Sequence, residues 1–199
     1  PDVDMMSFTG STRAGSLVAQ NAAPTVKRVT QELGGKSPNI ILDDADLDLA
    51  VDCAVQGAFF SAGQRCTASS RLIVTAGIHD AFVEAMIERL AAIRVGDARD
   101  PKTQIGPVVS AQQLAVDERY IALGRDEGAI LVHGGGRPEK VPNGYYLAPT
   151  LFAGTSNDMR INREEIFGPV ATVQSVADYD EALQVANDTD YGLFGGIIT

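Results

Sequence analysis

The chain alternates between short runs of apolar residues and longer segments in which apolar residues recur every three or four positions. The short runs predict β-strands, and the longer segments predict amphipathic helices. We expect strands at residues 5–8, 27–33, 39–42, 71–75, 129–132, 150–152 and 170–176. We expect a helix that ends at residue 23 and further helices at residues 43–60, 79–93, 111–127 and 178–188. Strands that alternate with helices indicate an α/β fold with a largely parallel sheet.

Composition restricts the class of protein. The 199 residues are 45% hydrophobic and 21% charged, which is enough apolar material for a core. A net charge of −10 argues against a nucleic-acid partner, because clustered lysine and arginine bind phosphate backbones. We expect no membrane association, because no apolar run reaches about 18 residues and no basic leader is visible. Two cysteines make no disulfide framework and favour a reducing, cytoplasmic setting.

A glycine-containing turn joins the first expected strand to the first expected helix, in the stretch SFTGSTRAG. Gly10, Ser11 and Gly15 shape this turn, and the N–H groups and dipole of a helix N-terminus suit a pyrophosphate. The spacing differs from G-x-G-x-x-G, so an ordinary turn capped by Ser11 stays open on spacing alone.

A glutamate ends the second expected strand, in the stretch QELGGKSP. The glycines after Glu32 can leave open space for a water molecule in front of its carboxylate. Burial would raise the pKa of such a carboxylate toward neutrality and make it a general base. A surface glutamate without a chemical role is the alternative.

Cys66 follows Gln64 and Arg65 after a long apolar segment, in the stretch FFSAGQRCTA. A thiolate is a strong nucleophile toward carbonyl carbon, and Arg65 or helix N-terminal amides would stabilise it. A buried packing thiol is the alternative, because that is the usual role of a free cysteine.

The stretch REEIFGPV places Glu164 and Glu165 just before Phe167. A glutamate can accept hydrogen bonds from both hydroxyls of a ribose, and a phenylalanine can rest against a flat ring. A loop with a buried phenylalanine explains the same residues equally well.

Other chemistries find weaker support. A cysteine–histidine hydrolase would need His79 or His133 near Cys66, and no local signature supports either histidine. HGGG at 133–136 resembles a lipase oxyanion loop, but G-x-S-x-G is absent, so these glycines are interpreted as a strand end. DDADLD lacks the glycine and final glutamate of a calcium loop, so we expect helix capping there and no metal site.

Taken in order, the stretches FTGST-x-x-G, ELGGKSP, GQRC and EEIFGPV resemble the NAD(P)-dependent aldehyde dehydrogenase superfamily. The resemblance extends along the whole chain through IGPVVS, GYYLAPTLF and the closing N-x-x-x-YGL. It implies the catalytic-domain fold of that family, with three layers around a largely parallel sheet, and a remnant of the Rossmann-like cofactor domain. The implied domains are residues 1–34 for the remnant and 35–199 for the catalytic domain, truncated at its C-terminus.

The resemblance implies a role for each motif residue. Cys66 would attack an aldehyde to form a thiohemiacetal, with its backbone N–H at the oxyanion, and NAD or NADP would accept the hydride. Glu32 would activate the water that hydrolyses the resulting thioester to a carboxylic acid. The expected cofactor-binding residues are Gly10, Ser11 and Gly15 at the pyrophosphate, Leu33 and Gly34 near the nicotinamide, and Glu165 and Phe167 at its ribose and ring side.

The resemblance also implies missing parts. A lysine near the adenosine ribose, an oxyanion-hole asparagine and a strand used in oligomerisation would all lie outside these residues. Because the chain also starts at a proline and stops in an apolar run, we interpret it as a piece of a longer protein. We expect the piece alone to be inactive or nearly so, and the longer protein to be a homo-oligomer acting on a small-molecule aldehyde.

Two alternatives and the substrate stay open. A CoA-acylating relative would generally lack the water-activating glutamate, and a non-catalytic relative would not need Cys66, Glu32 and Glu165 together. GQRCTASSR most resembles members that act on acidic semialdehydes, such as 2-oxoglutarate semialdehyde. Arg65 would then attract the substrate carboxylate, or else face away into a structural ion pair.

Overall fold

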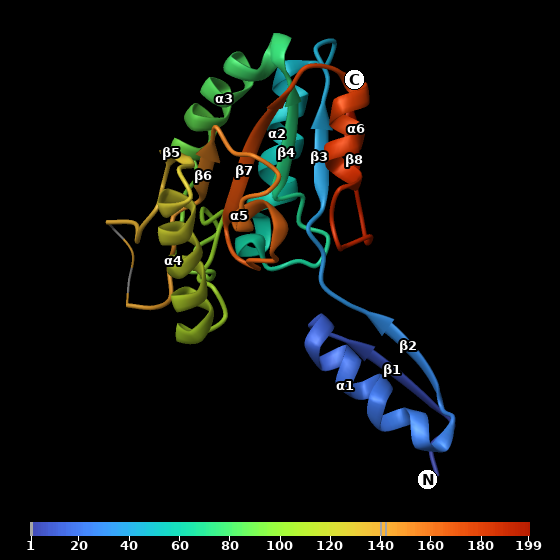
Figure 1. Ribbon diagram of the computed structural model, residues 1–199. Helices are drawn as coiled ribbons and strands as arrows, with labels where there is room; N and C mark the ends of the chain where they lie inside the picture. The colour runs from blue at the N-terminus through green and yellow to red at the C-terminus, as the bar shows by residue number, and fades with distance from the viewer. Residues whose placement is uncertain (1, 140, 142) are drawn as a thin grey trace.

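The computed structural model describes residues 2–139, 141 and 143–199, and these residues form two sheets. In the smaller sheet β1 (Met5–Thr9) and β2 (Arg28–Glu32) pair in parallel, and α1 (Thr12–Ala22) connects them. The larger sheet has six strands in the order β5-β6-β7-β4-β3-β8. Figure 1 shows the β1–α1–β2 unit standing apart from the larger body, joined to it by the segment that leads from β2 into β3.

The larger sheet is mostly parallel, as predicted. Parallel pairing joins β3 to β4 and β8, and it joins β7 to β4 and β6; these strands are β3 (Pro38–Ile41), β4 (Arg71–Thr75), β6 (Thr150–Ala153), β7 (Val170–Val176) and β8 (Gly196–Ile198). The edge strand β5 (Ile130–His133) instead runs antiparallel to β6. No helix is described between β5 and β6, and a direct connection permits antiparallel pairing, whereas parallel neighbours need a crossover.

Helices cover both faces of this sheet, so the fold has the three layers that the resemblance implies. Leu72 packs in the core with α2 (Leu47–Phe59) and α3 (Ala76–Ala91), while its neighbour Ile73 packs with α6 (Tyr179–Asn187). Leu151 and Phe152 divide in the same way, with Phe152 against α4 (Ala111–Asp126) and α5 (Arg160–Arg163). This division follows from the alternation of side chains along a strand.

The predicted elements are found, with differences at their ends. Residues 43–46 do not belong to α2, because Asp46 caps it by accepting a hydrogen bond from Leu49 N at 2.9 Å. The capping interpretation of DDADLD is therefore confirmed, and the predicted start of this helix is wrong. The helix α3 begins at Ala76 instead of residue 79, and it ends at Ala91.

One α-helix and one β-strand of the structure have no counterpart in the prediction. The helix α5 has only four residues, too few to show a period, and β8 lies in a glycine-containing apolar run. Among the described residues, none of the helices has the length and apolar character needed to cross a bilayer.

Candidate active site

One cavity of about 660 Å³ brings most of the predicted site residues together. Seven of the nine predicted residues line it: Gly10, Ser11, Leu33, Gly34, Cys66, Glu165 and Phe167. Five further residues line it, of which only Arg65 had a predicted contact: Thr9, Gln64, Arg65, Thr67 and Gln113. The cavity thus joins the β1–α1 turn to the cysteine loop of the larger body.

The β1–α1 turn follows the predicted pattern. Ser11 is the N-cap of α1, and its Oγ accepts a hydrogen bond from Ala14 N at 3.3 Å. Gly10 N donates to the carbonyl oxygen of Glu32 at 3.0 Å, which ties the turn to the end of β2. The capping interpretation is confirmed, and capping leaves the turn on the cavity wall, so the two interpretations of this stretch are compatible.

Gly15 is buried and does not line the cavity. A Cβ at residue 15 would stand 2.6 Å from Leu33 Cδ2, so the glycine allows α1 to lie closely against Leu33. Its visible function is to place the Leu33 side chain at the wall.

Glu32 ends β2, and its side chain is exposed and does not line the cavity. The burial that would raise the pKa of this carboxylate is therefore not found in this chain, where the Glu32 residue is exposed at the end of β2. Its neighbours Leu33 and Gly34 do reach the cavity wall.

The ELGGKSP segment lies between the glutamate and the cysteine of the site. A Cβ at Gly34 would overlap the carboxylate of Glu165, and Gly35 N donates to Glu165 Oε1 at 3.2 Å. A Cβ at Gly35 would stand 2.6 Å from the carbonyl oxygen of Cys66. A glycine is therefore required sterically at residue 35, which meets the Cys66 backbone, whereas a side chain at residue 34 would displace the Glu165 carboxylate.

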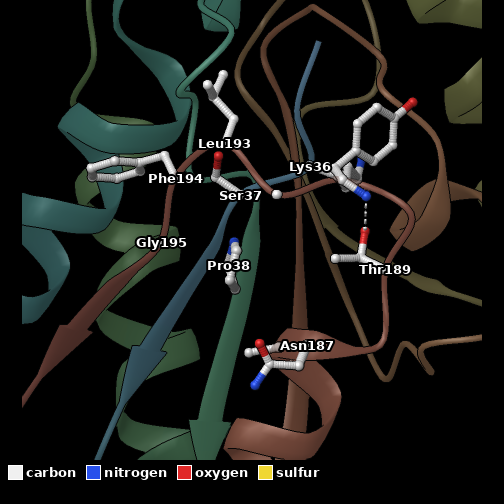
Figure 2. A pocket seen from close by; sticks show the side chains of 11 residues that line it. Lys36, Ser37, Pro38, Asn187, Thr189, Leu193, Phe194 and Gly195 are labelled. Carbon is white, nitrogen blue, oxygen red and sulfur yellow. Dashed lines mark hydrogen bonds between the residues drawn. The ribbon is translucent and has the colours of Figure 1, made fainter. Parts of the chain in front are cut away.

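Charge in this region is partly buried. Burial raises the pKa of Glu165, while the Gly35 N–H and the nearby Lys36 act in the opposite direction. Lys36 is buried, and burial, with Arg71 adding to it, lowers the pKa of its amine to about 7. Lys36 also lines a second cavity of about 340 Å³, bordered by Ser37, Asn187, Thr189 and Phe194 (Figure 2).

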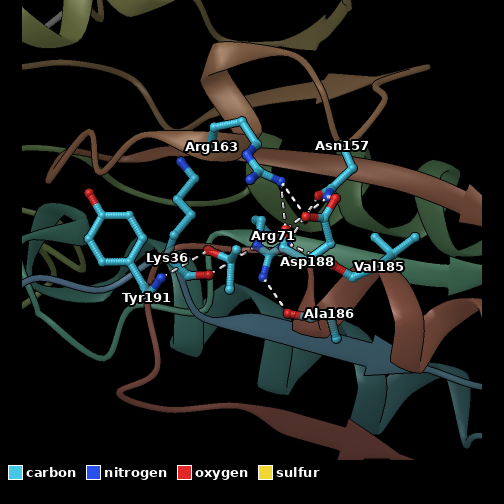
Figure 3. Close-up of polar contacts among 9 residues, drawn as sticks. Lys36, Arg71, Asn157, Arg163, Val185, Ala186, Asp188 and Tyr191 are labelled. Atoms are coloured by element: carbon cyan, nitrogen blue, oxygen red, sulfur yellow. Dashed lines mark hydrogen bonds and ion pairs between the residues drawn. The ribbon is translucent and has the colours of Figure 1, made fainter.

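Arg71, on β4, holds the ELGGKSP segment in place through hydrogen bonds. Its Nε donates to the Lys36 carbonyl at 2.9 Å, and its Nη2 donates to the Ala186 carbonyl at 2.9 Å. Its Nη1 donates to Asn157 Oδ1 at 3.1 Å and to the Val185 carbonyl at 3.2 Å, as Figure 3 shows. Burial lowers the pKa of Arg71 to about 10. The bonds to Lys36, Val185 and Ala186 fasten the ELGGKSP segment to the C-terminal end of α6, and the fourth adds Asn157.

Cys66 lies in a turn after the short 3₁₀ helix η2 (Phe60–Gly63) and is partly exposed to the cavity. The packing-thiol alternative is therefore not supported. Ser61, Ala62 and Gly63 have left-handed backbone angles, with φ of 58°, 55° and 67°. No helix begins at Cys66, so the expected support from helix N-terminal amides is wrong.

Arg65 lines the cavity, but its Nη2 is bonded to backbone carbonyl oxygens. Its Nη2 donates to the carbonyl oxygens of Gln56 at 2.6 Å and Gly57 at 2.7 Å, in the last turn of α2. These bonds do not support the expected attraction of a substrate carboxylate, and the alternative of a structural ion pair is wrong, because the partners are backbone carbonyls. Arg65 ties the cysteine loop to the helix that precedes it.

Neither histidine is placed to act as a base for Cys66. His79 and His133 line two other cavities, and neither lines the cavity that holds the thiol. The Nδ1 of His79 lies 2.8 Å from Asp80 Oδ1. A cysteine–histidine hydrolase is thereby contradicted. Within the described ranges, no group of three or more histidine, cysteine or acidic side chains is arranged to hold a metal ion.

Two glutamines at the cavity were not predicted as site residues. Gln64 Oε1 accepts a hydrogen bond from Val109 N at 2.9 Å, which holds the cysteine loop to the IGPVVS loop. Gln113 Nε2 donates to the Ile166 carbonyl at 2.9 Å. The place of Gln64 inside GQRC was a usable signal, whereas Gln113 lies on an amphipathic helix without a motif.

The fold and the cavity define a class of protein. It is an α/β protein in which an accessible thiol, a half-buried carboxylate and a capped strand–helix turn surround one cavity. The model of the aldehyde dehydrogenase family matches residues 1–199, and the chain belongs to this family.

Relatives agree with this assignment. The chain is 45% identical over 198 residues to betaine aldehyde dehydrogenase of Bacillus subtilis (strain 168), covering 98% of this chain and 40% of the relative. A crystal structure of betaine aldehyde dehydrogenase from Staphylococcus aureus with NAD+ has a TM-score of 0.97 and 43% identity, covering 99% of this chain and 40% of that one. The crystal structure of HpcC from Thermus thermophilus has a TM-score of 0.95 and 44% identity, covering 99% and 39%. The chain therefore spans about 40% of the length of the curated relative.

Proposed function

We propose that this chain supplies the nucleophile and part of the cofactor surface of an NAD(P)-dependent aldehyde dehydrogenase, which oxidises an aldehyde to a carboxylic acid. The observation that carries the proposal is the shared cavity, because the Cys66 thiol borders the same space as the Gly10–Ser11 turn and the Glu165 carboxylate. Since the chain spans about 40% of its relative's length, we place the activity in a longer protein that contains it.

The residues present fit a nicotinamide dinucleotide. Gly10 and Ser11 begin a helix of 11 residues, whose free N–H groups would hold a pyrophosphate. Gly34 leaves no room for a Cβ beside Glu165, and the glutamate carboxylate would accept hydrogen bonds from the ribose hydroxyls. Phe167 is 39% exposed and would lie against the side of the ring. When bound, the nicotinamide supplies the hydride acceptor that turns a thiohemiacetal into a thioester.

The sulfur of Cys66 performs the first step. Its thiolate adds to the aldehyde carbon, and the carbonyl oxygen takes the negative charge, with the Cys66 backbone N–H as its donor. Covalent capture holds the substrate carbon in one orientation, an effect that contributes up to about 7–11 kcal/mol to lowering the barrier. The Gly35 contact with the Cys66 carbonyl oxygen keeps the backbone of this residue in place.

Glu32 performs the last step in this proposal. Its carboxylate takes a proton from the water that attacks the thioester, which releases the acid and returns the thiolate. A base in position typically contributes about 10²–10⁴-fold to such a step. Glu32 is exposed next to Leu33, which borders the cavity, so its side chain has to turn toward the cavity for this step. Glu32 also favours hydrolysis over transfer to CoA, and release of free acid without added CoA tests that choice.

The substrate we propose is a small aldehyde that needs no carboxylate contact with Arg65, because that guanidinium is bonded to Gln56 and Gly57. The two free thiols, Cys53 and Cys66, suit a reducing compartment, so we propose a cytoplasmic location. We also propose a homo-oligomer for the longer protein, by analogy with the family.

Turnover of the longer protein tests the proposal. Cys66→Ser is expected to abolish NAD(P)+ reduction by an aldehyde while cofactor binding persists, and Cys53→Ser is the matched control. Cys53 lies on the exposed side of α2 and should be dispensable. Full turnover in the Cys66→Ser variant would disprove the nucleophile assignment.

A further inference from the structure

Asp117, on α4, is a buried carboxyl group for which the proposed mechanism has no use. It has 0% exposure, and its Oδ2 has no hydrogen-bond partner among the described residues. Burial raises its pKa to about 7, against an opposing hydrogen bond from Gln113. A buried carboxyl group is costly to a fold, so its contacts need an explanation.

The first contact runs through Gln113 toward the cavity. Gln113 Nε2 donates to Asp117 Oδ1 at 2.7 Å and to the Ile166 carbonyl at 2.9 Å. Gln113 also lines the cavity that holds Cys66. One amide therefore joins the buried carboxyl group, the cavity wall and the EEIFGPV loop.

The second contact is direct. A Cβ at Gly168 would overlap the carboxyl group of Asp117, so the loop backbone lies immediately against it. Phe167 stands between the two contacts with a φ of 62°, a left-handed angle that is unfavourable for a phenylalanine. The Ile166 carbonyl on one side and Gly168 on the other hold Phe167 in that conformation.

The same loop backbone reaches the nucleophile. A Cβ at Gly63 would overlap the carbonyl oxygen of Gly168, and Gly63 lies three residues before Cys66. A continuous set of contacts thus runs from Asp117 through Gly168 to Gly63 and the cysteine loop.

We propose that Asp117 is a positioning residue that, with Gln113, fixes the Phe167 turn and the backing of the Cys66 loop. That the Phe167 turn forms part of a cofactor-binding surface rests on the proposed function. That Asp117 and Gln113 hold the Cys66 loop in place does not depend on the proposed function.

Thiol alkylation in the 199-residue chain tests the inference, with the two cysteines compared in one sample. Iodoacetamide labelling of Cys66 and Cys53 is followed over time by mass spectrometry of the peptides. Asp117→Leu removes the acceptor and should speed labelling of Cys66 relative to Cys53 by about 3–10-fold, the range expected for one lost hydrogen bond. Asp117→Asn keeps an acceptor oxygen and should restore a ratio near that of wild type.

Two further variants separate positioning from general loosening. Gln113→Leu removes the same link from a half-buried position, and it serves as the test if Asp117→Leu fails to fold. Ile121→Ala, buried on the same helix, removes apolar packing in the cluster that contains Ile166 but none of these hydrogen bonds, and should leave the ratio unchanged.

An unchanged or smaller ratio in both Asp117→Leu and Gln113→Leu, or the same rise in Ile121→Ala, would overturn the proposal. The assay needs neither cofactor nor turnover. Its failure is therefore distinguishable from a failure of the proposed enzyme function, which Cys66→Ser tests in the longer protein.

Discussion

The carboxylate of Glu165 occupies the position that a Cβ at residue 34 would need, and it accepts a hydrogen bond from the next residue, Gly35. Two motifs that lie 130 residues apart in the sequence thus meet at a glycine. The contact sets how far the Glu165 carboxylate reaches into the cavity, and it leaves the second carboxylate oxygen without a backbone donor from this segment. That oxygen is available to a ribose hydroxyl.

Gly34→Ala is expected to displace Glu165 and weaken NAD(P)+ binding. The loss of a hydrogen bond between a charged acceptor and a ligand typically costs about 1.5–3 kcal/mol, which corresponds to roughly 10–100-fold in the dissociation constant. Titration of cofactor against the longer protein by calorimetry measures this effect.

Gly136→Ala is the control for that substitution. Nothing lies within 4 Å of a Cβ at residue 136, and the backbone angle there is not left-handed. Its affinity for cofactor should equal that of wild type. Equal cofactor affinities in Gly34→Ala and Gly136→Ala would show that Glu165 does not contribute to cofactor binding.

Sequence motifs predicted the centre of this site because its residues belong to short motifs that can be recognised from residue types adjacent in the sequence. The two successive glycines at residues 34 and 35 marked the place, although we expected them to leave open space for a water molecule, and the structure fills that space with Glu165 and the Cys66 carbonyl oxygen. The cap at Ser11 could likewise be predicted, because the residue type and the following helix are adjacent in sequence.

The remaining features depend on contacts that no local pattern records. The guanidinium of Arg65 turns back eight and nine residues to carbonyl oxygens, although adjacency to Cys66 suggested a substrate contact. The bond from Gln113 to Ile166 spans 53 residues. The exposure of Glu32 depends on which elements cover the end of β2, and a sequence pattern cannot show that.

Arg65→Ala is expected to reduce activity without regard to substrate charge. The guanidinium holds the loop through its bonds to Gln56 and Gly57, so turnover of an acidic semialdehyde and of its uncharged analogue should fall by the same factor. The free energy of unfolding should drop by about 1.5–3 kcal/mol, because two hydrogen bonds from a charged donor are lost and one of them is exposed to solvent. Steady-state kinetics with the two substrates, alongside denaturant unfolding, provide the measurement. A loss confined to the acidic substrate would show that Arg65 binds its carboxylate.

Lys36→Met is expected to change how stability depends on pH. Burial lowers the pKa of the Lys36 amine from 10.5 to about 7. The nearby Arg71 also lowers this pKa, whereas Glu165 and Glu164 act in the opposite direction. Between these two pKa values the unfolded chain binds a proton that the folded chain lacks, so this group makes stability rise with pH. Below about pH 7 both states are protonated and the penalty of burying the charge is complete.

Denaturant unfolding of the 199-residue chain at several pH values between about 7 and 10 tests this expectation. The rise in the free energy of unfolding should be smaller in Lys36→Met than in wild type. Replacement of the exposed Lys102 by methionine should leave the wild-type slope unchanged. Parallel curves for wild type and Lys36→Met would contradict the assignment of a proton to this buried amine.

The β1–α1–β2 unit is expected to open far more readily than the larger sheet in the 199-residue chain. Four of the five residues of β1 are exposed, including Met5 at 45% and Met6 at 38%, whereas all five residues of β4 are buried. A two-stranded sheet with so little cover is marginally stable, so its backbone amides should exchange with deuterium roughly 100-fold faster than those of β4. Hydrogen-exchange mass spectrometry resolves the two regions.

The same instability limits what the chain can do alone. The turn at Gly10 and Ser11, where we propose that the pyrophosphate binds, is held by this unit and is poorly preorganised. The chain by itself should therefore reduce no measurable NAD+ with aldehyde present. Iodoacetamide should still label Cys66, because the loop that carries it belongs to the stable body. Equal amide protection in β1 and β4, together with sustained turnover by the purified chain, would show that these 199 residues already form a complete catalytic unit.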